Sequence, residues 1–307
     1  MAPFGCPVLR VVRRKRLSLA LVALRQTHGG TVASVKLFHY TSRDTALEHI
    51  LPTGRLRFGR LPRTNDPREF APISFGIVDR VDENDQLTTR NPSELIEEAD
   101  ALLRDSVHVL CLTEDRRSHG GEQRGYGNGP RRARMWAQYA ANHTGVCLCF
   151  DGKRLIGAAE DQLGGPGRTL LHAAVDYLPE GEYPRATTLF QPRAEQDLKT
   201  FIENLVGTIP WDLFFAKDWD WNSETEYRFL LRGDTQDEEF IDVRGALEAV
   251  IVGQRFHPVY RPGLYKLCKE LEIDPLQIQW EMGLPFVVRI LDPGDRRLTD
   301  AAAAKPE

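Results

Sequence analysis

Short, almost wholly apolar runs recur along the chain at irregular intervals, and they constrain the fold more than any other feature. The clearest runs are residues 107–112, 145–150 and 247–253. Runs of this length, rich in branched side chains and bounded by turn residues, predict buried strands. They do not alternate regularly with helices, as the strands of a doubly wound fold do. We therefore expect an α+β fold with a mixed, mainly antiparallel central sheet and flanking helices.

Turn and capping residues predict further elements. A strand over residues 34–40 is followed by a helix over residues 42–51, for which Ser42 is the expected cap. Helices are also expected over residues 93–104 and 195–206, and a late helix includes residues 266–270.

Charge is distributed unevenly along the 307 residues. The net charge is −4, but residues 1–36 carry seven Lys or Arg and no acid, which leaves 33 basic and 44 acidic residues in the rest of the chain. A body with about −11 net charge does not favour binding to a nucleic-acid duplex, although a local basic groove remains open. We expect a basic extension over residues 1–33, a single α+β catalytic-type domain over 34–291, and a solvated tail over 292–307.

Five cysteines lie mostly in apolar runs, which predicts buried thiols in a reducing compartment and hence a cytoplasmic protein. The spacing of Cys147 and Cys149 is the alternation of a strand, so no metal site is expected there. The apolar stretch at residues 17–24 is too short to cross a membrane, and no membrane partner is expected.

Acidic and basic side chains converge in the segment 217–231, which is read as a strand that starts polar and ends apolar. Alternation along a strand would place Glu224, Glu226 and Arg228 on one side. Two carboxylates this close raise the pKa of at least one of them unless a cation compensates. Lys217 either neutralises the pair or caps the preceding segment, and a solvated charged ladder is the alternative interpretation.

Two loops carry further polar groups. Residues 116–134 are dense in Gly and Arg, which is typical of a mobile cationic lid over an anionic ligand. Asn65, Asp66 and Glu69 lie in a turn-rich segment, where they are either turn residues or part of a site.

Several spaced motifs together resemble the bacterial domain-of-unknown-function family 2971 over about residues 36–255. The motifs are Phe38-His-Tyr-Thr41, Asn65-Asp-Pro-Arg-Glu-Phe70, Met135-Trp-Ala-Gln-Tyr-Ala140, Gly145-Val-Cys-Leu-Cys-Phe-Asp151, Lys217 with Trp221-Asn-Ser-Glu-Thr-Glu-Tyr-Arg228, and Val250-Ile-Val-Gly253. The family name carries no chemistry.

A second, more distant pattern is similar to the layout of ADP-ribosyltransferases and their RNA phosphotransferase relatives. It consists of a His-Tyr-Thr after the first strand and a Glu-x-Glu on a late strand. The resemblance implies that His39 holds a ribose of NAD, that Glu226 is the catalytic carboxylate, and that Glu224 is its helper. It also implies a central aromatic that stacks on nicotinamide, with Tyr139 and Trp136 as candidates. The remaining residues assigned to NAD binding are Tyr40, Thr41, Asn65, Asp66, Glu69 and Arg228.

The expected function is therefore an NAD-dependent ADP-ribosyltransferase or NAD glycohydrolase that modifies a protein, a nucleic acid or water. In prokaryotes, enzymes of this type serve as toxins or defence effectors. A first alternative is a metal-dependent nuclease or phosphotransferase whose ligands are Asp66, Glu69, Glu224 and Glu226. A second alternative is a non-enzymatic module that senses a nucleotide.

Overall fold

The computed structural model describes residues 35–60, 76–78, 97–98, 100–101, 106–115, 129–179, 188–190, 214–233 and 237–290. The expected helices over residues 93–104 and 195–206 lie largely or wholly outside them.

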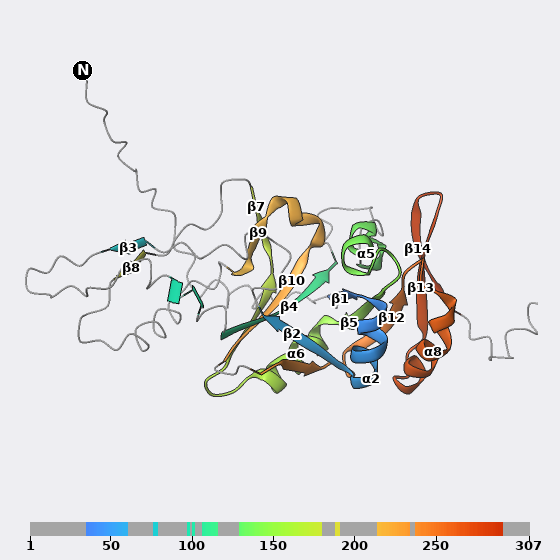
Figure 1. Ribbon diagram of the computed structural model, residues 1–307, viewed down its shortest axis with the longest axis horizontal. Helices are drawn as coiled ribbons and strands as arrows, with labels where there is room; N and C mark the ends of the chain where they lie inside the picture. The colour runs from blue at the N-terminus through green and yellow to red at the C-terminus, as the bar shows by residue number, and fades with distance from the viewer. Residues whose placement is uncertain are drawn as a thin grey trace, which may run out of the picture. The chain divides into compact units, whose positions relative to one another are not determined.

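A ten-stranded sheet forms the centre of the described part (Figure 1). Along its main path the strand order is β11-β2-β4-β1-β5-β12-β13-β14, while β10 pairs with β4 and β6 pairs with β10. Its strands are β1 (Lys36–Thr41), β2 (Arg55–Arg60), β4 (Val107–Glu114), β5 (Val146–Asp151), β6 (Thr169–Ala174), β10 (Glu226–Arg232), β11 (Glu239–Asp242), β12 (Leu247–Val252), β13 (Pro275–Glu281) and β14 (Leu284–Arg289).

The pairs in this sheet are antiparallel, except for the parallel pair of β12 and β13. The expected α+β class with a mainly antiparallel sheet is therefore confirmed. Two small parallel pairs join β3 (Gly76–Val78) to β8 (Thr188–Phe190) and β7 (Asp176–Leu178) to β9 (Ala216–Asp218). The three apolar runs singled out in the sequence are β4, β5 and β12.

Short helices flank the sheet. They are η1 (Thr45–Ile50), α2 (Leu51–Thr53), η3 (Gly129–Arg131), α5 (Ala133–Tyr139), α6 (Gly152–Leu163), η5 (Trp219–Glu224), η6 (Pro258–Tyr260) and α8 (Arg261–Glu270). Ser42 caps the first helical segment as expected, since its Oγ accepts a hydrogen bond from the Thr45 backbone N–H at 3.1 Å. Within the described part of the chain, no helix is long and apolar enough to cross a membrane.

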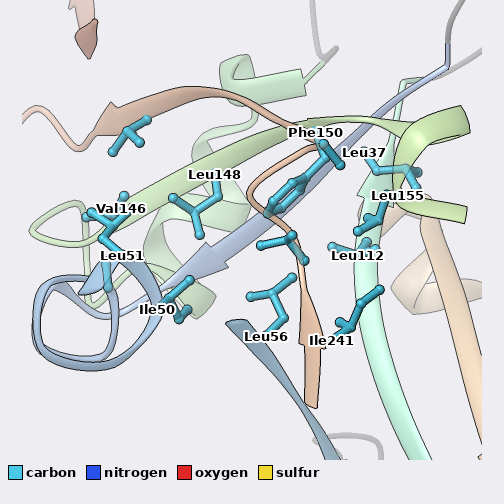
Figure 2. Packing of buried hydrophobic residues seen from close by; sticks show 14 of the residues in the cluster. Leu37, Ile50, Leu51, Leu56, Leu112, Val146, Leu148, Phe150, Leu155 and Ile241 are labelled. Carbon is cyan, nitrogen blue, oxygen red and sulfur yellow. The ribbon is translucent and has the colours of Figure 1, made fainter. Parts of the chain in front are cut away.

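One face of the sheet, here called the α6 face, carries the larger apolar core. Leu37, Leu148 and Phe150 point to this face and pack with buried residues of η1, α2, α6 and α8 (Figure 2). Full burial of a Leu or Phe side chain contributes about 1.5–3 kcal/mol. A one-residue slip of β5 would exchange Leu148 and Phe150 for Cys147 and Cys149, so the register is firmly fixed.

The opposite face, here called the α5 face, carries a smaller core. Phe38, Tyr40 and Cys147 lie on this face and pack against Met135 and Trp136 of α5. The turn after α5 docks closely on the strands, because a Cβ at Gly145 would lie only 2.2 Å from the carbonyl oxygen of Thr41. This close approach fixes α5 over β1, and it is on the α5 face that the acidic residues of the late strand gather.

Candidate functional site

The acidic segment is not one continuous strand. Lys217 lies on β9, Glu224 is the last residue of the 3₁₀ helix η5, and β10 begins only at Glu226. Thr225 joins the two elements with φ of 42°, a left-handed conformation that is rare for a β-branched residue. The predicted strand was thus wrong at Glu224, which reaches the site from a helix end rather than by strand alternation.

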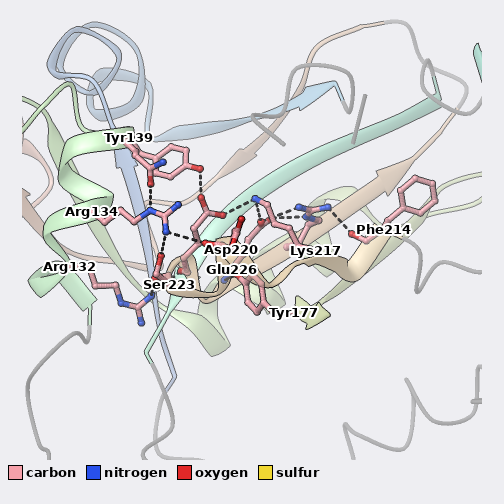
Figure 3. Close-up of polar contacts among 12 residues, drawn as sticks. Arg132, Arg134, Tyr139, Tyr177, Phe214, Lys217, Asp220, Ser223 and Glu226 are labelled. Atoms are coloured by element: carbon pink, nitrogen blue, oxygen red, sulfur yellow. Dashed lines mark hydrogen bonds and ion pairs between the residues drawn. The ribbon is translucent and has the colours of Figure 1, made fainter. Parts of the chain in front are cut away.

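Four charged side chains from β9, η5 and β10 contact one another, and we call them the charge cluster (Figure 3). They are Lys217, Glu224, Glu226 and Arg228. Lys217 Nζ donates to Glu224 Oε2 at 2.7 Å and to Glu226 Oε2 at 3.3 Å. Arg228 holds Glu226 in a bidentate pair, with Nε 2.6 Å from Oε1 and Nη2 3.0 Å from Oε2. All four side chains are at most 5% exposed, so this is a buried network rather than a solvated ladder.

Neighbouring polar groups complete the network. The hydroxyl of Tyr139 on α5 donates to Glu224 Oε1. The hydroxyl of Tyr177 on β7 accepts a hydrogen bond from the Glu226 backbone N–H at 2.8 Å, and Arg228 Nη1 donates to the carbonyl oxygen of Phe214 at 2.7 Å. Tyr177 has no motif of its own in the sequence. The pairing of β7 with β9 and the bond from the Val175 backbone N–H to the Glu226 carbonyl oxygen bring it here.

Burial and neighbouring donors act on the pKa of Glu226 in opposite directions. Burial by itself raises the pKa, but the charge and hydrogen bonds of Arg228, the charge of Lys217 and a hydrogen bond from Cys111 outweigh it and lower the pKa to about 2. Glu226 is therefore ionised at neutral pH. Of the two roles left open for Lys217, the structure selects the neutralisation of both carboxylates.

Two arginines at the end of the Arg-rich segment hold the turn between η5 and β10. Arg132 donates to the carbonyl oxygens of Glu224 at 2.9 Å and Glu114 at 2.7 Å, and also to the Thr225 hydroxyl. Arg134 donates to the Asp220 carbonyl oxygen at 3.1 Å and to Ser223 Oγ at 2.8 Å. These guanidinium groups position the turn; residues 116–128, the remainder of the expected lid, lie outside the described residues.

The Trp221 side chain of η5 adjoins the charge cluster. Lys217 Nζ lies 4.7 Å from the ring centroid of Trp221, and the Arg134 guanidinium lies 5.7 Å from it. Both contacts fall within the range of a cation–π interaction. Trp221 was not among the expected site residues. The spacing of Trp219 and Trp221, shortly before Glu224 and Glu226, is the sequence pattern that could have indicated it.

His39 does not share a face with Glu226. Phe38 is paired with Thr113 of β4, and Thr113 is paired with Glu226, so these three residues lie in one row on the α5 face. The next residue, His39, points to the α6 face, where its cross-strand partner Leu148 belongs to the larger core. The sheet therefore separates His39 from the charge cluster.

His39 is a half-buried histidine, and its surroundings favour the neutral imidazole. Burial lowers its pKa, and its Nδ1 lies 3.4 Å from the carbonyl oxygen of Cys111. It occupies the point where β1 leaves β4, since the β1–β4 pairing is confined to Leu37 and Phe38.

The other residues expected at an NAD site are placed as follows. Trp136 is fully buried and donates from Nε1 to the Pro130 carbonyl oxygen at 2.6 Å, with its ring edge-on to Tyr40. The Tyr40 hydroxyl donates to the Gly129 carbonyl oxygen at 2.7 Å, and Thr41 is buried at the end of β1. Both aromatic rings are thus packing residues of the α5 face. Asn65, Asp66 and Glu69 lie outside the described residues.

The expected metal-site alternative also required Asp66 and Glu69. Among the residues that the structure describes, no group of three or more His, Cys, Asp or Glu could hold a metal ion. Glu224 and Glu226 are instead neutralised by Lys217 and Arg228.

Comparison with known proteins gives one result. Residues 135–229 match the model of a family described as "Protein of unknown function (DUF2971)". This part of the chain is similar to the DUF2971 family. The match confirms the family indicated by the sequence motifs, and it runs from α5 to β10, so the charge cluster and Tyr139 fall inside the DUF2971 region. No curated protein and no solved structure matches the chain.

Proposed function

We propose that the charge cluster is the acidic centre of an NAD-consuming enzyme of ADP-ribosyltransferase type. Cleavage of the nicotinamide glycosidic bond builds positive charge on the ribose, and a fixed carboxylate stabilises that charge. The observation that carries the proposal is the buried, ionised Glu226, whose pKa of about 2 suits a permanent anion rather than a general acid at neutral pH.

Within this proposal, Glu226 faces the developing cation and Glu224 is its helper. The 3.3 Å contact from Lys217 is the longest of the bonds to Glu226, and it is the one that a ribose hydroxyl would replace. Tyr139 and Lys217 both fix Glu224. His39 has no part in the site, because it lies across the sheet. The macromolecule or water that accepts ADP-ribose is left open, as is a role as a toxin or defence effector.

The direct test is release of nicotinamide from labelled NAD by the purified protein, in the presence of protein, nucleic acid or water as acceptor. Loss of one preorganised charged group from a reaction centre costs about 10²–10³-fold in rate. We therefore expect Glu226→Gln to reduce nicotinamide release by at least that factor. Glu281→Gln, at the exposed end of β13, is the matched control and should react as the unaltered protein does.

Removal of the Glu226 charge also leaves Arg228 without its partner, so folding has to be monitored by circular dichroism. Glu226→Asp keeps the charge but shortens its reach, and it should fold and still lose most of the rate. If the unaltered protein neither releases nicotinamide with any acceptor nor binds NAD in calorimetry, the proposal is wrong.

A ligand-sensing module without catalysis is the second candidate, and one observation favours it. Both oxygens of Glu226 already bond Arg228 or Lys217, so the carboxylate ties β9 to β10. In that case a folded Glu226→Gln protein keeps its ligand affinity and its biological effect. The enzyme instead predicts that binding survives and the effect is lost.

A further inference from the structure

Three reactive side chains meet on the α6 face, on the opposite side of the sheet from the charge cluster. Tyr227 lies between Glu226 and Arg228 on β10 and therefore points the other way. Its hydroxyl oxygen lies 2.7 Å from Nδ1 of His172 on β6. Nε2 of the same histidine lies 3.5 Å from Oε1 of Glu160 on α6.

Packing holds the two rings in this arrangement. His172 is paired with Phe229 across the ladder and lies diagonal to Tyr227. The His172 and Tyr227 rings are stacked with centroids 6.0 Å apart, and Phe229 contacts both of them at 5.5 and 5.6 Å. The His172 side chain is 11% exposed while that of Glu160 is 59% exposed, so the cluster reaches solvent on the α6 side.

One tautomer of His172 makes these contacts those of a base and the group that it deprotonates. A neutral imidazole with its proton on Nε2 directs that N–H toward Glu160 and leaves Nδ1 as an acceptor for the phenol. A nucleophile within hydrogen-bond reach of a base, with the base oriented by a third group, is the arrangement of nucleophilic catalysis.

We propose that Glu160, His172 and Tyr227 form a second reactive site, in which Tyr227 is a nucleophile toward phosphoryl groups. The phenol oxygen attacks phosphorus and forms the O–P bond, its proton passes to His172 Nδ1, and the leaving group departs with the electron pair of the broken bond. His172 is the general base, and Glu160 is a positioning residue. This site is independent of NAD chemistry on the α5 face.

The backbone around Tyr227 selects phosphoryl over acyl transfer. Acyl transfer needs free backbone or side-chain donors for an oxyanion. Throughout residues 227–232, β10 is paired with β4 on one edge and with β6 on the other. Its backbone amide groups therefore donate to neighbouring strands and are not available to an oxyanion. Phosphoryl transfer depends instead on the position of an in-line nucleophile and on nearby positive charge, which His172 acquires as it takes the proton.

The test is covalent labelling of the full chain by an alkyl fluorophosphonate, with each modified tyrosine located and timed by mass spectrometry of peptides. The tyrosine displaces fluoride, so one O–P bond forms and one P–F bond breaks. Tyr260 is the internal control, because it is 36% exposed and its ring lies under the Arg43 guanidinium. The His257 ring lies edge-on to it with centroids 6.3 Å apart, but His257 Nδ1 accepts the Val259 backbone N–H at 3.3 Å rather than the phenol. General-base assistance contributes about 10²-fold or more, so Tyr227 should react faster than Tyr260 by about that factor.

Two variants separate activation from folding. His172→Gln should slow labelling of Tyr227 by about 10²-fold and leave Tyr260 unchanged. Glu160 is exposed on α6, so Glu160→Gln leaves the fold intact; it should lower the ratio of the Tyr227 and Tyr260 rates, and Glu160→Asp should restore part of it. A Tyr227 that reacts no faster than Tyr260, or a ratio that neither variant alters, would overturn the proposal and leave a packed aromatic cluster.

Discussion

Glu226 shows at the scale of one residue how a buried charge is tolerated. Its carboxylate is removed from water but bonded by the Arg228 guanidinium and the Lys217 ammonium group. A buried ion pair adds little net stability, because desolvation offsets the attraction, whereas loss of one partner costs about 3–5 kcal/mol. A cluster of this kind therefore fixes the position of a charge more than it stabilises the fold.

The depressed pKa of Glu226 makes stability depend on pH in a defined direction. The pKa of Glu226 is about 2 in the folded protein and 4.5 for an unperturbed glutamate, as in the unfolded chain. Its contribution to stability is therefore complete above pH 4.5 and is lost as the pH falls toward 2. Its size is about 3 kcal/mol at 1.36 kcal/mol per pKa unit. The free energy of unfolding should be measured with urea at pH 5 and pH 2. Between these values the unaltered protein should lose about 3 kcal/mol more than Glu226→Gln does. A constant difference between the two proteins over this range would contradict the assigned pKa.

The turn between η5 and β10 shows at the scale of elements how the two carboxylates are brought together. Thr225 adopts a left-handed conformation that costs about 1–2 kcal/mol for a residue other than glycine. Arg132 compensates by bonding the Glu224 carbonyl oxygen and the Thr225 hydroxyl, while Thr225 Oγ1 donates to the Glu114 carbonyl oxygen at 2.8 Å. Without this turn, Glu224 would not reach Lys217.

Replacement of Arg132 by Lys tests whether Arg132 stabilises the turn at Thr225. Lys keeps the charge, but it cannot reach several acceptors at once as the planar guanidinium does. The Glu224 carbonyl oxygen then loses its bond from Arg132, and the Glu114 carbonyl oxygen keeps only its bond from the Thr225 hydroxyl. We expect thermal or urea unfolding to show a loss of about 1–3 kcal/mol. The adjacent exposed Arg131→Lys is the control and should change stability by less than about 0.5 kcal/mol. Equal effects of the two changes would show that Arg132 does not hold the turn.

At the scale of the whole sheet, the two faces carry separate clusters of polar side chains. The charge cluster and α5 lie on one face, whereas His39, the larger core and the Glu160–His172–Tyr227 site lie on the other. A two-residue period divides neighbouring residues between these faces, so residues adjacent in a motif, such as Glu226 and Tyr227, belong to different environments.

His39→Gln tests the division of the faces. A side chain on the α6 face cannot touch a ligand bound at Glu226, so nicotinamide release and NAD affinity should stay within about twofold of the unaltered protein once both are corrected for the folded fraction. A ribose contact from His39 would instead weaken NAD binding by more than about tenfold, which is the cost of about 1.4 kcal/mol. Calorimetry with NAD decides between the two results.

The sequence alone was sufficient to identify the main strands and to indicate the DUF2971 family, although the family model matches residues 135–229 rather than the expected 36–255. Residues 107–112, 145–150 and 247–253 became β4, β5 and β12 because apolar runs of this length gain free energy only inside a sheet. Glu226 and Arg228 share a side because strand alternation is a local property of the backbone. The motifs that indicated DUF2971 include residues of the matched region.

Only the tertiary structure decided which residues form one site. Whether His39 and Glu226 lie on the same face depends on how β1 pairs with β4 and how β4 pairs with β10. Burial of the core sets the register of these pairs, and neither residue sets it. Glu224 arrives through a strained turn that is stabilised by Arg132, a residue 92 positions away. Tyr177 and the Glu160–His172–Tyr227 site arise from pairings between distant segments. Local sequence patterns determine backbone elements, but the contacts between elements are set by how the whole chain buries its apolar surface.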